Sequence, residues 1–463
     1  MTIKEFIVTK SVKLALPIIG GMSDKNLGRF FSLASKAAPT KFTKSFMIAL
    51  NKLREDKHPI IEMLRRAITR TNPHIRNRLM NSILVKHHWY GSVKRDEMRS
   101  QGLAVPGTFL ISPTMRCNLH CTGCYAANYS TKDDLESEVI DRVLNEAEEL
   151  GIFWITILGG EPFIREDMWE IYKKHQNIFF QIFTNGTLLD KNTTKKIAEL
   201  GNILVVFSLD GFEQETDSRR GQGVFQKVME GMDLLRESGV PFGFSYMITR
   251  KNVNTIISDQ FSDMLVEKGC LIGWNFLYMP VGPNPDATLM PTPEQRELIR
   301  THGPQRIRNK KPIFTIDFWN DAPYMGGCIA GARHFFHINS HGDVEPCIFI
   351  HMATDNIHDK SLKEVINSPY FKAFRSRQPY GENLLRPCTV IDHPHVLREI
   401  YNTCQPYPTD SPICELITSP LSDALDNYSQ KVASILDPAW NHEFANFNFT
   451  PDTFAPGNVQ EKD

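Results

Sequence analysis

The stretch "RCNLHCTGCYA", residues 116–126, places Cys117, Cys121 and Cys124 on one short segment. Thiolates bind soft metals and iron–sulfur clusters, and three closely spaced cysteines can hold three corners of a [4Fe–4S] cube. The fourth iron would then lack a protein ligand and could bind another molecule. A structural zinc site normally has four ligands, so His120 within the segment keeps a Cys3His zinc site as the alternative.

Strands and helices alternate after this segment. Six short apolar segments, separated by helical patterns, cover residues 108–112, 152–158, 178–184, 203–209, 240–248 and 271–279. Such alternation predicts parallel strands joined by right-handed crossovers. We therefore expect an α/β fold, either a doubly wound sheet or an incomplete barrel. In both folds the chemistry lies at the carboxyl ends of the strands, and the cysteine segment follows the first strand.

The spacing C-x3-C-x2-C after the first of six β/α steps resembles the radical S-adenosylmethionine (SAM) superfamily over roughly residues 106–410. The resemblance implies a partial (β/α)6 barrel in which Cys117, Cys121 and Cys124 hold a [4Fe–4S] cluster and SAM chelates the fourth iron. It also implies the reaction. An electron from the reduced cluster cleaves SAM to a 5′-deoxyadenosyl radical, which abstracts hydrogen from a substrate.

Further motifs at the strand ends extend the resemblance. "LGGEPFIR" matches the GGE motif of the family, which implies that Gly159, Gly160 and Glu161 lie at the amino group of SAM. "FSLDG" resembles the fourth-strand segment, which makes Ser208 and Asp210 candidates for the ribose hydroxyls. The alternative for the second motif is a turn or helix cap without a ligand.

Two other positions concern the same pocket. "TNG" after the third strand suggests that Asn185 lies near SAM. The residue before the third cysteine is usually large and apolar in the family and touches adenine, but here it is Gly123. Tyr125 is the candidate that compensates for this loss.

A second cysteine set follows the β/α region. "GGCIAGARHFFHINSHGDVEPC" predicts a β-hairpin that brings Cys328 and Cys347 together, and "RPC" returns Cys388 to them. This pattern resembles the SPASM and twitch extensions of radical SAM enzymes and implies one auxiliary iron–sulfur cluster. Cys404 is the expected fourth ligand, with Cys414 in reserve. An open fourth iron that binds substrate and a zinc site are the alternatives.

The remaining features of the cysteine inventory favour a reducing compartment. The chain has 9 cysteines, an odd number that argues against a disulfide framework. Cys270 at a strand start is expected to be an inert buried thiol. His393 and His395 are weaker candidates for ligands. We expect a cytoplasmic protein.

The N-terminal part of the chain is basic. Residues 1–100 hold 20 Lys and Arg against 7 Asp and Glu, whereas the whole chain has a formal net charge of −1. This asymmetry indicates a membrane surface or a polyanion as partner, or a basic face that docks on the acidic body of the same chain. An apolar run in residues 1–21 is too short to span a bilayer but could lie in its interface.

The sequence therefore predicts four regions. They are a basic helical segment over 1–105, a radical SAM partial barrel over 106–320, a SPASM- or twitch-like domain over 321–415 and a poorly ordered tail over 416–463.

The expected function is reductive cleavage of SAM and hydrogen abstraction from a substrate that the sequence does not identify, with a lipid or membrane-associated molecule as the first candidate. Residues 1–105 are basic and apolar, and they lack the short strands of the leader-binding domain that peptide-modifying members often carry. The alternatives are a peptide-modifying maturase and a non-catalytic zinc-binding scaffold with a basic arm. The expected partners are an electron donor of the flavodoxin or ferredoxin type and a membrane surface on which the protein is peripheral. Nucleic acid is not expected, because the arm lacks interleaved aromatic residues.

Overall fold

The computed structural model describes residues 20–38, 41–126, 134–331, 333–409, 416–418 and 420–445. Within these ranges, no helix combines the length and the apolar character that crossing a membrane requires.

One nine-stranded sheet forms the centre of the molecule, with the spatial order β7-β6-β5-β4-β3-β2-β1-β8-β9. The pairings from β7 to β8 are parallel and the β8–β9 pairing is antiparallel. The six predicted strands are present as β1 to β6, which confirms the predicted α/β partial barrel. The strands are β1 (Thr108–Ile111), β2 (Trp154–Ile157), β3 (Phe179–Thr184), β4 (Ile203–Leu209), β5 (Phe242–Ile248), β6 (Ile272–Leu277), β7 (Phe314–Asp317), β8 (His337–Ile338) and β9 (Val344–Glu345).

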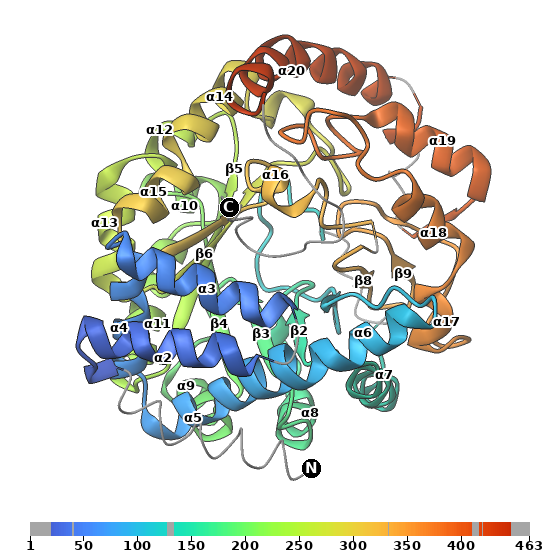
Figure 1. The fold of residues 1–463 in the computed structure, drawn as a ribbon. Helices are drawn as coiled ribbons and strands as arrows, with labels where there is room; N and C mark the ends of the chain where they lie inside the picture. The colour runs from blue at the N-terminus through green and yellow to red at the C-terminus, as the bar shows by residue number, and fades with distance from the viewer. Residues whose placement is uncertain are drawn as a thin grey trace.

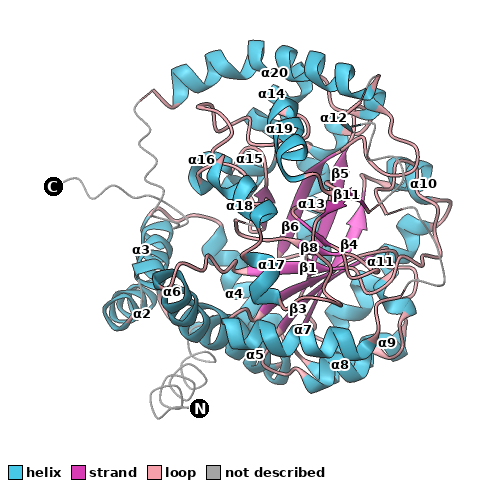
Figure 2. Cartoon of the chain, turned by 90° about the vertical axis from the view of Figure 1, so that its right-hand side faces the viewer, coloured by secondary structure: helices cyan, strands magenta, loops and turns pink. Residues whose placement is uncertain are grey.

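Helices α7 to α13 connect these strands and surround the sheet (Figure 2). Local sequence sets their ends: Gly151 adopts the left-handed conformation that ends α7, with φ of 82°. The side chain of Asp190 caps α9 by accepting a hydrogen bond from the Thr193 N–H at 2.7 Å. The helices are α7 (Ser137–Leu150), α8 (Met168–Lys174), α9 (Lys191–Leu200), α10 (Glu213–Arg220), α11 (Val224–Glu237), α12 (Val253–Ile256) and α13 (Asp259–Lys268), with short 3-10 turns at Pro162–Ile164 and Ala287–Leu289.

The barrel interior is aromatic. Because side chains alternate along a strand, one set faces the outer helices and the other faces the interior. Phe183 of β3 reaches Trp274 and Phe276 of β6 with ring centroids 5.6 and 6.3 Å apart. These contacts join two strands that are not neighbours in the sheet, so the sheet curves around an interior space.

The described part of the N-terminal segment is helical, as predicted. Arg66 donates a hydrogen bond to the carbonyl oxygen of Val266 at 2.7 Å, and the ring of His87 lies 5.7 Å from that of Trp154, the first residue of β2. The segment therefore packs against the N-terminal ends of the strands, on the body of its own chain (Figure 1). Its elements are α2 (Asp24–Ala37), α3 (Lys41–Glu55), α4 (Ile60–Arg70), α5 (Pro73–Met80), the π-helix η1 (Asn81–Gly91) and α6 (Ser92–Ser100).

The region after β6 folds over the carboxyl ends of the strands. The predicted hairpin is present as β8 and β9, and β8 also pairs with β1 of the barrel, so the hairpin extends the central sheet. The other elements are α14 (Pro293–His302), α15 (Pro304–Lys310), α16 (Ala322–Met325), β10 (Met352–Ala353), α17 (Leu362–Ile366), α18 (Pro369–Ser376), α19 (Pro394–Cys404), β11 (Tyr407–Pro408) and α20 (Leu421–Glu443).

Helix α20 corrects one prediction. The sequence predicts a poorly ordered tail from residue 416, but Leu421–Glu443 form the long helix at the top of Figure 1. Val432 and Leu436 of this helix form a small core with Leu385. Their spacing belongs to a helical apolar stripe, which outweighs the polar composition of the chain end.

Candidate active site

A cavity of about 310 Å³ lies inside the partial barrel and is lined by cysteines of both predicted sets. Inward-facing residues of the strands, among them Leu110, Phe183 and Trp274, form its apolar wall. The fold therefore brings two segments that are some 200 residues apart in the sequence to the same space. The cysteines in the lining are Cys117, Cys121, Cys124, Cys328, Cys347 and Cys388.

The first cysteine set rests directly on the GGE motif. The N–H groups of Gly160 and Glu161 donate hydrogen bonds to the carbonyl oxygens of Thr114 at 3.0 Å and Arg116 at 2.8 Å. A β-carbon on Gly159 would lie 2.2 Å from the Thr114 oxygen. Gly159 also has φ of 110°, which favours glycine. The two glycines are therefore required because the cysteine loop crosses the end of β2 at close range.

Burial and nearby cations act in opposite directions on the thiols. Burial raises the pKa of the Cys117 thiol to about 11. Burial also raises the pKa of Cys121, while the neighbouring Arg220 and Arg219 oppose that rise. Because iron binds the thiolate, these two cations favour the ligating form of Cys121.

Glu161 lies behind the cavity wall. Its side chain is fully buried, and its carboxylate accepts hydrogen bonds from the Asn185 N–H at 2.8 Å and the Thr184 hydroxyl at 2.8 Å. Burial raises the pKa of this carboxyl to about 7. Glu161 thus ties the end of β2 to the end of β3. Its predicted contact with the amino group of SAM stays a prediction.

Asp210 forms a buried ion-pair cluster, and its predicted contact with the ribose stays a prediction. It is fully buried, and one carboxylate oxygen pairs with Arg219 at 2.8 Å and with Arg220 at 2.6 Å. Its other oxygen accepts a hydrogen bond from the Met247 N–H at 3.2 Å. Asp210 does not line the described cavity, but both arginines do, whereas the predicted Ser208 is part of the lining.

Arg219 and Arg220 are not among the site residues predicted from the sequence. Two adjacent cations end helix α10, the first helix after the fourth strand, and that position was the available signal. A guanidinium group binds carboxylates well, and SAM carries a carboxylate, so this pair suits its methionine end.

Two other residues predicted near SAM, Asn185 and Tyr125, line the cavity. The Asn185 side chain donates to Asn118 at 2.9 Å and lies 3.7 Å from the sulfur of Cys117. A β-carbon on Gly123 would lie 2.6 Å from the ring of Tyr278, which occupies the space that a larger residue would need. Tyr125 lines the cavity and its ring faces His351 with centroids 6.5 Å apart. It therefore links the cysteine loop to the auxiliary region.

Three cysteines of the second set meet in the cavity lining. Burial raises the pKa of Cys328 to about 11, and it also raises the pKa of Cys347 and Cys388, to which the neighbouring thiols add. Cys404, the expected fourth ligand, lies at the end of α19 and is not among the described residues that line the cavity. Cys414 lies outside the described residues.

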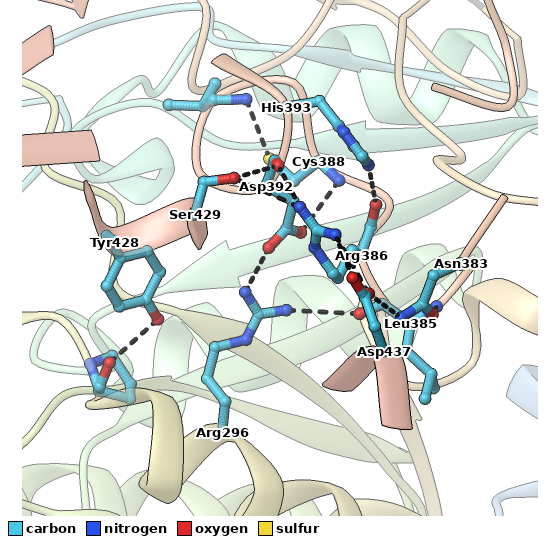
Figure 3. A network of polar contacts seen from close by, with 12 residues as sticks. Arg296, Asn383, Leu385, Arg386, Cys388, Asp392, His393, Tyr428, Ser429 and Asp437 are labelled. Carbon is cyan, nitrogen blue, oxygen red and sulfur yellow. Dashed lines mark hydrogen bonds and ion pairs between the residues drawn. The ribbon is translucent and has the colours of Figure 1, made fainter. Parts of the chain in front are cut away.

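Cys388 is held in a tight turn (Figure 3). The N–H groups of Asp392 and His393 both donate to its carbonyl oxygen at 2.9 Å, and the Val390 N–H lies 3.4 Å from its sulfur. His393, a weaker ligand candidate, uses its ring Nε2 on the carbonyl oxygen of Arg386 at 2.7 Å. The turn therefore presents Cys388, rather than this histidine, to the cavity.

The residues present fit two iron–sulfur clusters better than two zinc ions. Each set offers three thiols to a cavity, and the first has two arginines beside it for the carboxylate of SAM. Within the described residues, no group of three or more cysteine, histidine or acidic side chains converges on the position of a single metal ion.

Family models match both halves of this site. The model of the radical SAM superfamily matches residues 111–258, and the SPASM model, an iron–sulfur cluster-binding domain, matches residues 328–389.

Several curated proteins are similar in sequence to part of this chain. The Fe-coproporphyrin III synthase of Methanosarcina barkeri is 30% identical over 224 residues, which is 46% of this chain and 56% of that protein. The chain thus spans little more than half the length of that relative. Mycofactocin maturase MftC of Mycolicibacterium smegmatis is 27% identical over 281 residues, 58% of this chain and 69% of the relative. The PqqA peptide cyclase of Granulibacter bethesdensis is 26% identical over 309 residues, 62% of this chain and 80% of the relative.

Solved structures share the fold. Streptococcus suis SuiB bound to precursor peptide SuiA superposes with a TM-score of 0.55 at 20% identity, over 81% of this chain and 92% of that one. Native anSMEcpe with bound AdoMet gives a TM-score of 0.51 at 18% identity, over 69% and 99%. With both cysteine sets matched by family models, the chain combines a radical SAM superfamily region over residues 111–258 with a C-terminal SPASM iron–sulfur cluster-binding domain over residues 328–389.

Proposed function

We propose that this enzyme abstracts a hydrogen atom from an apolar substrate group held between its two cysteine sets. The observation that carries the proposal is that both sets line one cavity. In this chemistry one electron from the reduced cluster splits SAM into methionine and a 5′-deoxyadenosyl radical, which becomes 5′-deoxyadenosine when it takes hydrogen from the substrate. The second cysteine set would hold an auxiliary iron–sulfur cluster in the same space, and that cluster could accept an electron from the substrate radical.

In this proposal the residues of the chain bind and orient SAM and shield the radical from water. Arg219 and Arg220, held by the carboxylate of Asp210, would bind the carboxylate of SAM and so fix the direction of its reactive carbon. The aromatic wall, including Phe183 and Trp274, keeps water away from a radical that would otherwise react with the wrong partner.

For the substrate, a peptide is the best-supported class. The PqqA peptide cyclase by its name, and SuiB by its bound precursor peptide, are relatives with peptide substrates. An apolar cavity suits a hydrophobic or aromatic side chain of such a peptide. This choice reverses the preference for a lipid that the N-terminal segment suggested.

A tetrapyrrole fits less well, although heme-type synthases are among the relatives. Coproporphyrins carry several carboxylates, which need cations in a buried site. The charged residues in the described lining are Arg219 and Arg220, and in this proposal they bind the carboxylate of SAM.

A lipid chain is the second candidate, and two observations favour it. The cavity wall is mostly apolar, and the groove between α2 and α3 places exposed Leu33 beside Lys25, Arg29 and Arg54, with Glu55 also in its lining. Apolar and cationic groups together suit a membrane surface with anionic lipids. The proposed electron donor, a flavodoxin- or ferredoxin-type protein, is the same for either substrate.

SAM cleavage tests the reaction class. Anaerobically reconstituted, dithionite-reduced enzyme should form methionine and 5′-deoxyadenosine in equal amounts, and Cys124→Ala should form neither. Cys270→Ala is the matched control, because Cys270 is a buried thiol that is not part of the cavity lining. Intact SAM beside fully loaded clusters, with peptide and lipid fractions both present, would contradict the proposal.

Deuterium transfer tests the substrate class. Cell extract from a perdeuterated culture is separated into peptide and lipid fractions, and each is offered to the enzyme with unlabelled SAM. Deuterium in 5′-deoxyadenosine from the peptide fraction supports the first candidate. Deuterium from the lipid fraction alone overturns it in favour of the second.

A further inference from the structure

A buried ion pair stands directly behind Cys388. Asp392 is fully buried, and its Oδ2 accepts a hydrogen bond from the Cys388 N–H at 3.1 Å. Its Oδ1 pairs with the guanidinium of Arg296, whose side chain is only 3% exposed. Figure 3 shows Arg296 reaching from α14 toward this carboxylate. The cation therefore comes from a helix about 90 residues earlier in the chain.

The pair and the backbone together leave Cys388 little freedom. The Asp392 N–H returns to the Cys388 carbonyl oxygen at 2.9 Å, which closes a ring around the ligand residue. The Ser429 hydroxyl of α20 donates to the carbonyl oxygen of Asp392, and Arg386 of the same turn pairs with Asp437 of α20 at 3.1 Å. Helix α14 thus supplies the counter-charge, and helix α20 covers the turn.

The charges at this place matter for an iron–sulfur cluster. Nearby charge, hydrogen bonds to the sulfurs and solvent exposure set a cluster's reduction potential. A lone buried carboxylate one hydrogen bond from a ligand would favour the oxidised, less negative cluster. A lone buried guanidinium would favour the reduced cluster. Arg296 and Asp392 together cancel both effects while keeping the Cys388 N–H bonded.

We propose that Arg296 is a positioning residue of the auxiliary cluster, which acts through Asp392 to orient Cys388 and to hold the cluster's potential. The inference concerns the auxiliary cluster alone and goes beyond the proposed reaction, since it does not depend on the substrate. It joins a residue of the linker after β6 to a ligand of the SPASM domain.

Three full-length variants test it: Arg296→Met, Asp392→Asn and the double variant. Iron and sulfide are counted per chain, and the auxiliary cluster's midpoint potential is measured by EPR-monitored titration, with Cys124→Ala used to assign its signal. At a fixed poise, the ratio of reduced to oxidised cluster should fall about tenfold in Arg296→Met, which is about 59 mV for one electron. It should rise by a similar factor in Asp392→Asn and return to within about twofold of the parent in the double variant.

Controls separate this role from general support of the fold. Arg300 lies one turn further on α14 and pairs with Glu443 of α20 at 2.6 Å, so Arg300→Met removes a contact between the same helices without touching the Cys388 turn. It should leave the potential unchanged. Arg296→Lys, which keeps the charge, should have a midpoint potential much closer to that of the parent than Arg296→Met has.

Opposite shifts that cancel in the double variant are the signature of the charge pair. The proposal is overturned if the single variants move the potential in the same direction, or if they lose iron while the remaining clusters keep the parent potential. If Arg296→Met does not fold, Asp392→Asn decides, and an unchanged potential there overturns the proposal.

Discussion

Gly160 and Arg116 approach so closely that a β-carbon on Gly160 would lie 2.1 Å from the Arg116 carbonyl oxygen. The next residue, Glu161, donates its N–H to that same oxygen at 2.8 Å. The loop that carries Cys117 therefore packs directly on the backbone of the GGE motif. This packing requires glycine at position 160 whether or not a ligand is bound.

Gly160→Ala should unseat this loop, because the methyl group costs about 3 kcal/mol or more unless the loop moves away. We expect loss of the SAM-binding cluster and retention of the auxiliary cluster. The check is iron and sulfide per chain, with the EPR change on adding SAM. Gly21→Ala is the control, since a β-carbon there meets nothing within 4 Å. A Gly160→Ala protein whose signal still responds to SAM would contradict the seating argument.

Arg219→Met should weaken SAM binding about tenfold to a hundredfold, because it removes the proposed charge-assisted hydrogen bond from Arg219 to the carboxylate of SAM. Such a bond is worth about 1.5–3 kcal/mol. Asp210→Asn should have a smaller effect, since both guanidiniums keep their charge but lose their anchor. The SAM concentration that half-saturates the EPR change measures both. Arg236→Met, on the outer helix α11, should bind SAM as the parent does. Equal affinity in Arg219→Met would exclude this arginine from the SAM site.

His87 should make the fold sensitive to acid. Burial lowers its pKa well below the usual value. Below pH 6.5 the His87 imidazole therefore binds a proton in the unfolded chain but stays neutral in the folded protein. The free energy of unfolding falls as the pH drops through that value. At pH 5 the loss is about 2 kcal/mol.

His87→Phe keeps a ring against Trp154 and should remove about that much of the difference in unfolding free energy between pH 7 and pH 5. Urea unfolding at the two pH values measures it. His442→Leu, at an exposed position near the end of α20, serves as the control. A pH dependence that His87→Phe leaves intact would mean that other groups carry it.

Leu33→Asp should reduce association with anionic vesicles if the groove between α2 and α3 meets a membrane. Leu33 is 66% exposed and shares this groove with Arg29 and Arg54. Vesicle co-sedimentation with and without anionic lipid measures the effect. Val93→Asp is the control, because Val93 is 42% exposed on α6 and is not part of the groove lining. Undiminished sedimentation of the Leu33 variant would leave the basic helices with only their docking role.

Local pattern explains what the sequence could predict. Each of β1 to β6 is a short apolar segment, the segments are separated by helical patterns, and caps mark some of the helix ends, as at Asp190 and Gly151. Strand β7 was not predicted, because Phe314–Asp317 is short and half of its residues are polar. Helix α20 escaped because the polar chain end outweighed its apolar stripe.

Distances in space explain what the sequence could not predict. Cysteine order alone cannot tell that Cys388 joins the cavity while Cys404 stays at the end of α19. The two arginines at the end of α10 escaped for the same reason, since only the fold shows that Asp210 turns them toward Cys121. The motif identified Asp210, but only the structure shows that its carboxylate pairs with Arg219 and Arg220.

The pairing of β8 with β1 has a consequence for electron transfer. Leu110 and Ile111 are in register with His337 and Ile338, so the strand that leads to the first cysteine loop and the hairpin that leads to Cys347 belong to one hydrogen-bonded ladder. The tunnelling distance between the two metal centres is then a property of backbone geometry, not of a hinge between domains. Side chains of the cavity wall can change, and with them the molecules admitted, while the paired strands keep the backbone spacing between the two cysteine-bearing segments.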